Sequence, residues 1–384
     1  MYIIERAKNY TKRFFMFLEN RKGIKDKVVF ESFSGQSYSD NPRAISERFH
    51  EVSPKTEIVW LFTDPEKKRS IVPPYVRVEK RCTKTMIREY GTARWWINNF
   101  CMQEFMYKGK GQIYIQTWHG DRPFKKVIYE SSKLNFKNGE IRENKICDLC
   151  VAGSAMGEHV YRKAFRYTGK ILRVGSPRAD ILIKGNPQRV QATKKKLGIP
   201  LDVGIVMYAP TFRDKKGLQS EQDMHVIDFQ QLLKKLEKKY NIKWYCLLRV
   251  HPSLKMKSIY HSDPQIINVS LYEDMTDLML IADMLITDYS SSAGDFVLQD
   301  KPLLLYQYDL AEYEKDSREL HFKMQESPFW SAQTEEELFD IIQKITQQDI
   351  IKNCKDILDF YGSYESGHAA DAVCEYMLTQ KDKL

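Results

Sequence analysis

The sequence predicts an α/β protein in which two doubly wound parallel sheets face each other across a cleft. Short apolar runs bounded by turn residues alternate with helical stretches along most of the 384 residues, an alternation that is typical of parallel sheets. The alternation stops at residues 175–190, where glycines and prolines gather among polar residues, and then begins again. We therefore expect two domains, each with its own core, joined near that segment.

The predicted organisation has four segments: a basic amphipathic segment 1–26, an N-terminal domain 27–186, a C-terminal domain 187–347, and closing helices 348–384 that brace the first domain. Segment 1–26 mixes bulky apolar and basic residues, which is the composition of a helix lying on an anionic membrane surface. An amphipathic helix that packs on its own domain has the same pattern, so both interpretations stay open.

In the first domain, apolar runs predict five strands, at residues 28–30, 57–62, 76–79, 113–117 and 146–152. Two helices are expected between them, at residues 42–49 and 154–165. The first begins at Asp40-Asn41 with a proline in its first turn, and the second begins at Ser154, a residue suited to the N-cap.

The second domain repeats the pattern of strand followed by helix. Its predicted strands are residues 203–208, 244–250, 284–287 and 303–306. Its predicted helices, including the closing ones, are residues 229–238, 291–298, 335–346 and 366–378.

The composition indicates a soluble globular protein, with 42% apolar and 29% charged residues. No window approaches the roughly 18–20 apolar residues of a membrane-spanning helix, and the N-terminus does not resemble a signal peptide, so we expect a cytoplasmic protein. Seven scattered cysteines agree with that compartment. The nearest pair, Cys147 and Cys150, has no second pair or histidine nearby, so no zinc site is expected there and Cys150 is assigned to a strand.

The formal net charge of +9 favours a negatively charged partner. Nucleic acid, anionic lipid and a phosphorylated substrate are the candidates. The sequence has no RRM, zinc-finger or helix-turn-helix signature, which leaves nucleic acid without further support.

The strand–helix–strand unit of residues 284–306 contains the first candidate site. The turn after its first strand carries one acid and three hydroxyls: Asp288, Ser290, Ser291 and Ser292. Backbone N–H groups and hydroxyls at the start of a helix suit a phosphate group. A serine that simply caps the helix explains the same residues.

Ligands of such sheets bind beyond the carboxyl ends of the strands, so the residues after the other strands are also candidates. His119 follows strand 113–117 and precedes Gly120, and an imidazole suits a general base near neutral pH. Arg213 follows strand 203–208 and can fork onto a phosphate. Arg249 and His251 belong to the next strand end, where His251 can donate to a phosphate oxygen or stabilise a leaving group.

Several motifs resemble those of the CDP-glycerol glycerophosphotransferase family. They are Val29-Phe-Glu-Ser-Phe33, Tyr38-Ser-Asp-Asn-Pro-Arg43, Thr117-Trp-His-Gly120, Gly175-Ser-Pro-Arg-Ala-Asp180, Tyr208-Ala-Pro-Thr-Phe-Arg-Asp214, Arg249-Val-His-Pro252 and Thr287-Asp-Tyr-Ser-Ser291 with Asp295-Phe296. The similarity runs in order from about residue 27 to at least residue 313. It implies a GT-B fold of two Rossmann-like domains, and synthesis of teichoic-acid-like poly(alditol phosphate) chains at the inner face of a bacterial membrane.

The resemblance also implies roles for matching residues. The hydroxyl of a lipid-linked acceptor would attack the β-phosphorus of a CDP-alditol and release CMP. His119 would be the base that activates this hydroxyl, and His251 would lie near the donor pyrophosphate. Arg213 and the turn Ser290–Ser292 would hold that pyrophosphate.

Two places depart from the family pattern: Asp121-Arg122 stand where many members have Thr-Pro, and Ser292-Ala293-Gly294 replace bulkier apolar residues. The first departure leaves acceptor specificity undecided, and the second leaves the start of the helix undecided. Asp288 would repel a phosphate, so we expect it to orient a backbone or histidine group. Asp295 either reaches a substrate hydroxyl or faces solvent.

The predicted partners are CDP-glycerol or CDP-ribitol, an undecaprenyl-type lipid-linked acceptor and the anionic inner membrane surface, on which the protein would be peripheral. No metal or cofactor is predicted, because the cleft-lining segments hold no Asp-rich cluster. Two alternatives remain: a GT-B glycosyltransferase that uses a nucleotide sugar, and a non-catalytic membrane-associated assembly subunit. The sequence leaves self-association and the choice between glycerol and ribitol open.

Overall fold

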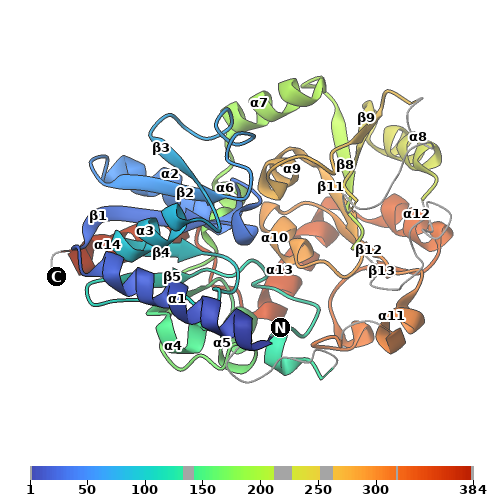
Figure 1. The fold of residues 1–384 in the computed structure, drawn as a ribbon. Coiled ribbons are helices and arrows are strands. Elements are labelled where there is room, and N and C mark those ends of the chain that lie inside the picture. The colour runs from blue at the N-terminus through green and yellow to red at the C-terminus, as the bar shows by residue number, and fades with distance from the viewer. Residues whose placement is uncertain (1, 133–141, 212–226, 251–262, 317–318, 382–384) are drawn as a thin grey trace.

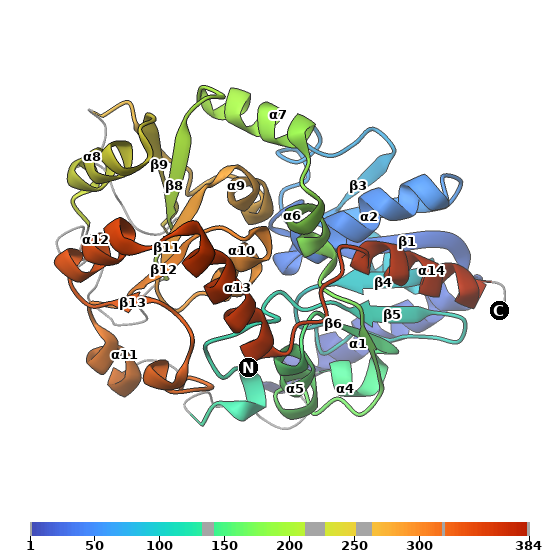
Figure 2. The same cartoon turned by 180° about the vertical axis from the view of Figure 1, so that it is seen from behind.

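The computed structural model describes residues 2–132, 142–211, 227–250, 263–316 and 319–381. They form two parallel sheets side by side, each covered by helices on both faces (Figures 1 and 2), which confirms the predicted α/β class. The first half of the molecule is built on a seven-stranded sheet and the second half on a six-stranded sheet. The exact boundaries proposed for the four segments stay predictions.

The first sheet has its earliest strand near the centre, and neighbouring strands are parallel throughout. Its order is β3 (Val76–Lys80), β2 (Glu57–Phe62), β1 (Lys25–Glu31), β4 (Ala93–Asn98), β5 (Ile113–Gln116), β6 (Leu149–Ala152) and β7 (Lys170–Arg173). Its central strands are buried on both faces, as their continuous apolar runs require.

The second sheet is also parallel throughout. Its order is β10 (Ile266–Asn268), β9 (Trp244–Leu248), β8 (Gly204–Tyr208), β11 (Met284–Thr287), β12 (Leu303–Tyr306) and β13 (Ser331–Ala332). Strands β11 and β12 have the predicted bounds. Strand β9 ends two residues before the predicted end at residue 250, so Arg249 and Val250 already belong to the loop after it.

Helices cover both sheets on both faces. Those of the first half are α1 (Tyr2–Asn20), α2 (Asp40–Val52), α3 (Lys84–Thr92), α4 (Glu143–Ile146), α5 (Ala155–Lys163) and α14 (Ala369–Lys381). The two sheets are linked through α6 (Asp180–Lys184) and α7 (Pro187–Leu197). Those of the second half are α8 (Phe229–Tyr240), α9 (Met275–Ile281), α10 (Ser292–Phe296), α11 (Leu310–Asp316), α12 (Glu335–Lys344) and α13 (Gln347–Tyr361).

Local capping accounts for several of these helix starts. Ser154 accepts a hydrogen bond from the Gly157 amide at the start of α5, as its sequence position predicts. Thr334 and Thr346 each form a capping box, at the starts of α12 and α13. The last helix, α14, returns to the first half and packs on α2, where Val373 and Met377 join the core of the first sheet (Figure 2).

Some sequence predictions are wrong or incomplete. The centrally placed β4 was not predicted, because α3 runs into it at Ala93 without a loop between them. The strand predicted at residues 146–152 begins only at Leu149, since Ile146 ends the short helix α4. Helix α13 was not predicted either. The edge strands β10 and β13 are too short to give a clear periodic signal, and β7 has only two apolar residues, which lie between Lys170 and Arg173.

Helix α1 lies along the outside of the first half (Figure 1). Its inner face contacts α3, and Met16 is fully buried there. On the opposite face Tyr10, Phe14 and Phe15 are 62%, 58% and 52% exposed. The helix therefore packs on its own half, as one of the two interpretations of segment 1–26 requires. Its exposed aromatic face remains compatible with the other interpretation, a helix that lies on a membrane surface. None of the described helices is both long and apolar enough to cross a membrane.

A buried group of ion pairs joins the two halves, and we call it the interdomain ion cluster. Arg122, after β5, donates to Asp295 of α10 at 2.7 Å and to Glu365 in the segment before α14. Arg178, in the link between the halves, donates to the other oxygen of Asp295 at 2.8 Å and pairs with Asp40 at 3.2 Å. Asp295 thus accepts from two arginines of the first half, and both arginines are at most 6% exposed.

Both departures from the family pattern meet at this cluster. A Cβ atom at Gly294 would lie 2.5 Å from the Arg122 side chain, so the glycine leaves room for the arginine. The neighbouring Asp121 accepts a hydrogen bond from the Gly153 amide at 2.7 Å and is buried. Arg122 therefore bonds across the boundary between the halves, Asp121 bonds within the first half, and neither residue lines the cavity between the sheets.

The ion cluster predicts a pH-dependent stability. Burial raises the pKa of Glu365 to about 7, although Arg122 opposes the rise. The folded protein thus keeps a proton that the unfolded chain loses near the ordinary value of 4.5, so the free energy of unfolding falls as the pH rises between these values, by on the order of 3 kcal/mol. Glu365→Gln should flatten this fall in thermal melts from pH 5 to 8. Asp121, whose pKa burial also raises, would leave a slope of the same sign. Identical slopes for the two proteins would contradict the assignment to Glu365.

Candidate active site

A cavity of about 460 Å³ lies between the carboxyl ends of the two sheets. The predicted site residues that line it are His119, Arg249, Ser290, Ser291, Ser292 and Asp295. A neighbouring cavity of about 480 Å³ lies beside α2 and α7, but none of the predicted site residues lines it. Arg213 and His251 lie outside the described residues, so their roles stay predictions from the sequence.

His119 is held in one orientation by its backbone and aromatic neighbours. Its Nδ1 lies 2.7 Å from the carbonyl oxygen of Asn99 and donates to it, which leaves Nε2 as the acceptor. The ring stacks on Phe100 with centroids 5.6 Å apart and lies against Trp118 and Phe33 at 4.0 and 5.2 Å. Burial lowers the pKa of His119, and the Asn99 carbonyl opposes this only in part. The ring is therefore neutral near pH 7 and ready to accept a proton.

The turn that carries His119 is conformationally strained. Trp118 has a φ of 49°, in the left-handed region that a bulky residue rarely adopts. The Gln116 side chain accepts from the Trp118 amide at 2.8 Å, and Asn41 donates to the carbonyls of Thr117 and Trp118. These bonds hold the turn so that the residue after Trp118 lies at the cavity.

The serine turn approaches His119 from the other half. A Cβ atom at Gly120 would lie 3.5 Å from Ser291 Oγ, so the turns after β5 and β11 meet across the boundary between the halves. Ser290 Oγ bonds Ser292 Oγ at 2.8 Å and accepts from the Ser292 amide at 3.3 Å. The helix that follows is shorter than predicted, five residues followed by a 3-10 turn, and no hydroxyl of Ser291 caps it. Of the serines in this turn, only Ser290 accepts a hydrogen bond from a backbone amide at the start of the helix, so the capping interpretation applies to Ser290 alone.

Asp288 and Asp295, the two acids of this region, both accept hydrogen bonds from protein groups. Asp288 accepts from the Thr211 amide at 2.9 and 3.0 Å and from the Tyr289 amide at 2.6 Å, so its carboxylate orients backbone as expected. Asp295 is 3% exposed and belongs to the interdomain ion cluster. Of the two alternatives for Asp295, exposure to solvent is therefore wrong, and each of its oxygens already accepts a hydrogen bond from an arginine.

Two further cations line the cavity. Lys68 pairs with Glu273 at 2.7 Å. Arg249 donates from Nη1 to the carbonyls of Val269 and Tyr272 at 3.2 and 3.0 Å. Burial lowers the pKa of Arg249, and the nearby carboxylates of Asp274 and Glu273 oppose this only in part. An anionic group in the cavity would therefore stabilise its charge.

Sequence reasoning missed two residues that build the site. Asn99 directly follows β4, and its side chain also ties the Ser32–Phe33 segment beside the cavity. The rule that found His119 would have found Asn99 had β4 been predicted. Arg178 lies within a motif used for the resemblance, but its position at the cavity depends on carboxylates distant in sequence, Asp40 and Asp295.

The arrangement combines a neutral imidazole, hydroxyl donors and cations around one cavity. Such groups can accept a proton from a hydroxyl and bind a phosphate. Among the described residues, the one group of His, Cys, Asp or Glu side chains close enough to hold a metal ion is Glu130, His159 and His321, which does not line this cavity.

Comparison with known proteins gives a consistent result. A family model described as CDP-Glycerol:Poly(glycerophosphate) glycerophosphotransferase matches residues 13–379. A teichoic acid glycerol-phosphate transferase of Staphylococcus aureus is 30% identical over 91% of this chain and 92% of its own length. A teichoic acid poly(glycerol phosphate) polymerase of Staphylococcus epidermidis is 30% identical over 84% of this chain, which spans only 46% of that polymerase.

A solved structure of the wall teichoic acid polymerase TagF matches the whole chain. It is 27% identical with a TM-score of 0.85, over 100% of this chain and 96% of that one. A histidine variant of TagF soaked with CDPG matches with a TM-score of 0.85 and 26% identity, over 99% of this chain and 95% of that one. The likeness confirms the predicted GT-B-like arrangement of the two sheets.

The environment of His119 predicts its titration. Because burial lowers its pKa below the ordinary 6.5, the ring should be neutral at pH 7, with the proton on Nδ1. Long-range ¹H–¹⁵N NMR of protein labelled at its eight histidines would show the tautomer and the midpoint, with His119→Gln assigning the signal. A midpoint above 6.5, or a proton on Nε2, would show that Nε2 is not free to act as a base.

Proposed function

Since the chain belongs to the CDP-glycerol:poly(glycerophosphate) glycerophosphotransferase family, we propose that it transfers glycerol phosphate from CDP-glycerol to the hydroxyl of a lipid-linked acceptor in teichoic acid synthesis. The single observation that carries the proposal is the meeting of His119 with the serine turn at one cavity. A base from one half faces phosphate-binding groups from the other, as a transfer between two substrates needs.

The reaction follows from these positions. The acceptor hydroxyl gives its proton to His119 Nε2 while its oxygen forms a bond to the β-phosphorus of the donor. The bond from this phosphorus to the bridging oxygen breaks, and that oxygen leaves on CMP. Phosphoryl-type transfer asks the protein mainly for positioning and for charge stabilisation. Arg249 and the hydroxyls of Ser290–Ser292 supply donors to the phosphate oxygens on the side of the second half.

The donor preference rests on the family description and on the relatives that match most of this chain, whose names specify glycerol phosphate, while two relatives matched over about 53% and 60% of the chain are named for ribitol phosphate. The acceptor rests on the predicted chemistry alone. A lipid-linked acceptor keeps the enzyme at a membrane surface. The aromatic outer face of α1, with the exposed Lys8, Lys12 and Arg13 beside it, supports peripheral binding to anionic lipid.

The first test is CMP release from CDP-glycerol and CDP-ribitol in parallel, with a lipid-linked acceptor analogue. His119→Ala should lower kcat by about 10²–10⁴-fold, because it removes one general base. His50→Ala is the matched control, since His50 stacks on Tyr75 and does not line the cavity. Equal rates for the His119 variant and wild type would exclude the base role. Release from neither donor by a folded protein would favour a nucleotide-sugar enzyme or a non-catalytic subunit.

Membrane binding is tested separately by vesicle flotation. Phe14→Ser with Phe15→Ser should weaken flotation with phosphatidylglycerol vesicles, because both rings leave the exposed face of α1 while buried Met16 remains. The control is Leu201→Ser with Ile351→Ser, which removes apolar side chains that are 58% and 48% exposed elsewhere. Equal flotation of the Phe14/Phe15 variant and wild type would exclude α1 as the contact.

A further inference from the structure

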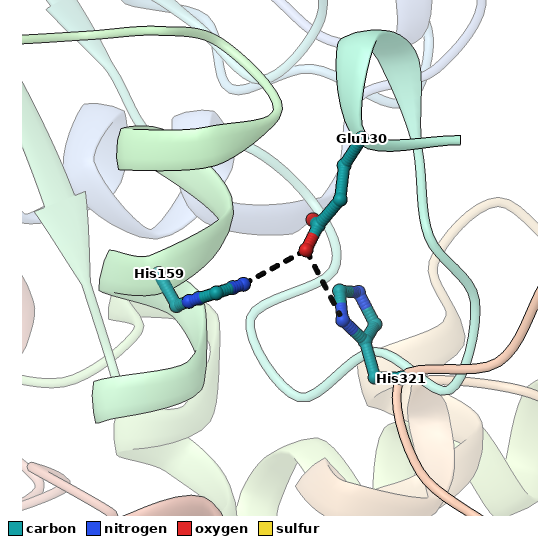
Figure 3. Close-up of side chains that lie close together, drawn as sticks. All are labelled: Glu130, His159 and His321. Atoms are coloured by element: carbon teal, nitrogen blue, oxygen red, sulfur yellow. Dashed lines mark hydrogen bonds and ion pairs between the residues drawn. The ribbon is translucent and has the colours of Figure 1, made fainter. Parts of the chain in front are cut away.

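A second group of titratable side chains lies outside the proposed active site. It consists of Glu130, at the end of a 3-10 turn (Ile128–Glu130), His159 on α5, and His321 in the segment after α11 (Figure 3). The first two belong to the first half and His321 to the second. We call this group the His–Glu cluster.

The three side chains point toward one another. His159 Nε2 lies 2.8 Å from Glu130 Oε1, and His321 Nδ1 lies 3.8 Å from the same oxygen (Figure 3). One donor atom from each of the three residues can be chosen so that all lie within 4.8 Å of one another. A tetrahedral zinc ion with bonds of about 2.0–2.2 Å holds its ligand atoms about 3.3–3.6 Å apart, so shifts of about 1 Å would suffice.

Hydrogen bonding within the protein does not satisfy the cluster. Glu130 Oε2 and His321 Nε2 are both buried, and neither has a hydrogen-bond partner among the described residues. The His321 side chain is only 3% exposed. Buried polar atoms without partners are rare in native proteins and often mark a missing ion or water. A bound cation with its water would supply partners for this carboxylate and ring.

The backbone around the cluster is already paired across the two halves. The His321 amide donates to the Phe124 carbonyl and the Lys126 amide to the Glu319 carbonyl, each at 2.8 Å. Lys125 and Leu320 form an antiparallel bridge between the same two segments. The backbone of His321 is therefore fixed against the first half by the fold.

We propose that Glu130, His159 and His321 form a binding site for a divalent transition-metal ion of the zinc type, which ties segment 319–322 of the second half to the first half. Two imidazole nitrogens and one carboxylate oxygen are ligands that suit zinc and its neighbours, whereas Mg²⁺ and Ca²⁺ prefer oxygen ligands alone. A fourth position remains for water. The site could not be predicted from the sequence, because the three residues come from separate elements and no short motif joins them.

Lys126 is the main opposing group. Its positive charge acts on His321 and would also repel an added cation. The negative charge of Glu130 offsets this repulsion, so the carboxylate is needed as well as the two rings. Replacing Lys126 by Gln should tighten metal binding, whereas replacing Glu130 by Gln should weaken it.

The test is titration of full-length, chelator-treated protein with Zn²⁺ by calorimetry and with Co²⁺ by visible absorption. Wild type should bind one equivalent, show the d–d bands of low-coordinate Co²⁺, and melt at a higher temperature when Zn²⁺ is present. His159→Ala should weaken binding at least about tenfold and abolish the thermal shift. His159 is the variant of choice because its side chain is 44% exposed, so its loss leaves the core intact.

His368→Ala is the matched control. His368 Nδ1 lies 3.1 Å from Asp371, so it forms a comparable pair of imidazole and carboxylate that lacks the second histidine. The His368→Ala protein should bind Zn²⁺ with the affinity of wild type. An excess of Mg²⁺ should not displace Zn²⁺ from either protein. Equal affinity of wild type and His159→Ala would overturn the proposal, as would the near-ultraviolet charge-transfer band of Co²⁺ bound to cysteine thiolate. Because neither readout uses catalysis, this test stands apart from the proposed transferase activity.

Discussion

The shared carboxylate of Asp295 is the contact on which the arrangement of the two halves depends. Burying an arginine is costly unless its charge is paired, and Arg122 and Arg178 have the oxygens of the same side chain as partners. Burial disfavours the charge of Arg178, yet the carboxylates of Asp295 and Asp40 more than offset this and raise its pKa. Any rotation that separated the halves here would leave buried charges unpaired. The position of α10 against the turn after β5 is therefore strongly constrained.

The active-site geometry follows from that constraint. Asp295 lies three residues beyond the serine turn, and Arg122 lies three residues beyond His119. Pairing these two residues brings His119 and the serine turn to the same cavity. Their relative placement is set by a buried charge pair three residues beyond each of them.

Much of the fold could be predicted from sequence, but the reasons for failure are specific. Strands β11 and β12 were predicted to the residue because their apolar runs end at clear turn signals, whereas β4 follows α3 directly, with no loop to separate the two elements. In the site, strand-end position alone identified His119 and the serine turn. It could not assign Asp295, because the partners of this acid are distant in sequence and only tertiary structure brings them together. The hydrogen bond from His119 to the backbone carbonyl of Asn99 could not be predicted either, because any residue at position 99 would supply that carbonyl.

The close approach of Gly294 to Arg122 has an evolutionary consequence. A side chain at position 294 and an arginine at position 122 cannot occupy the same space, so neither position can change independently of the other. A bulkier residue on α10 becomes acceptable only when the arginine is replaced by something smaller. A chain that carried both large residues would force the halves apart. We therefore infer that the two positions are epistatic, so that the effect of a substitution at one depends on the residue at the other.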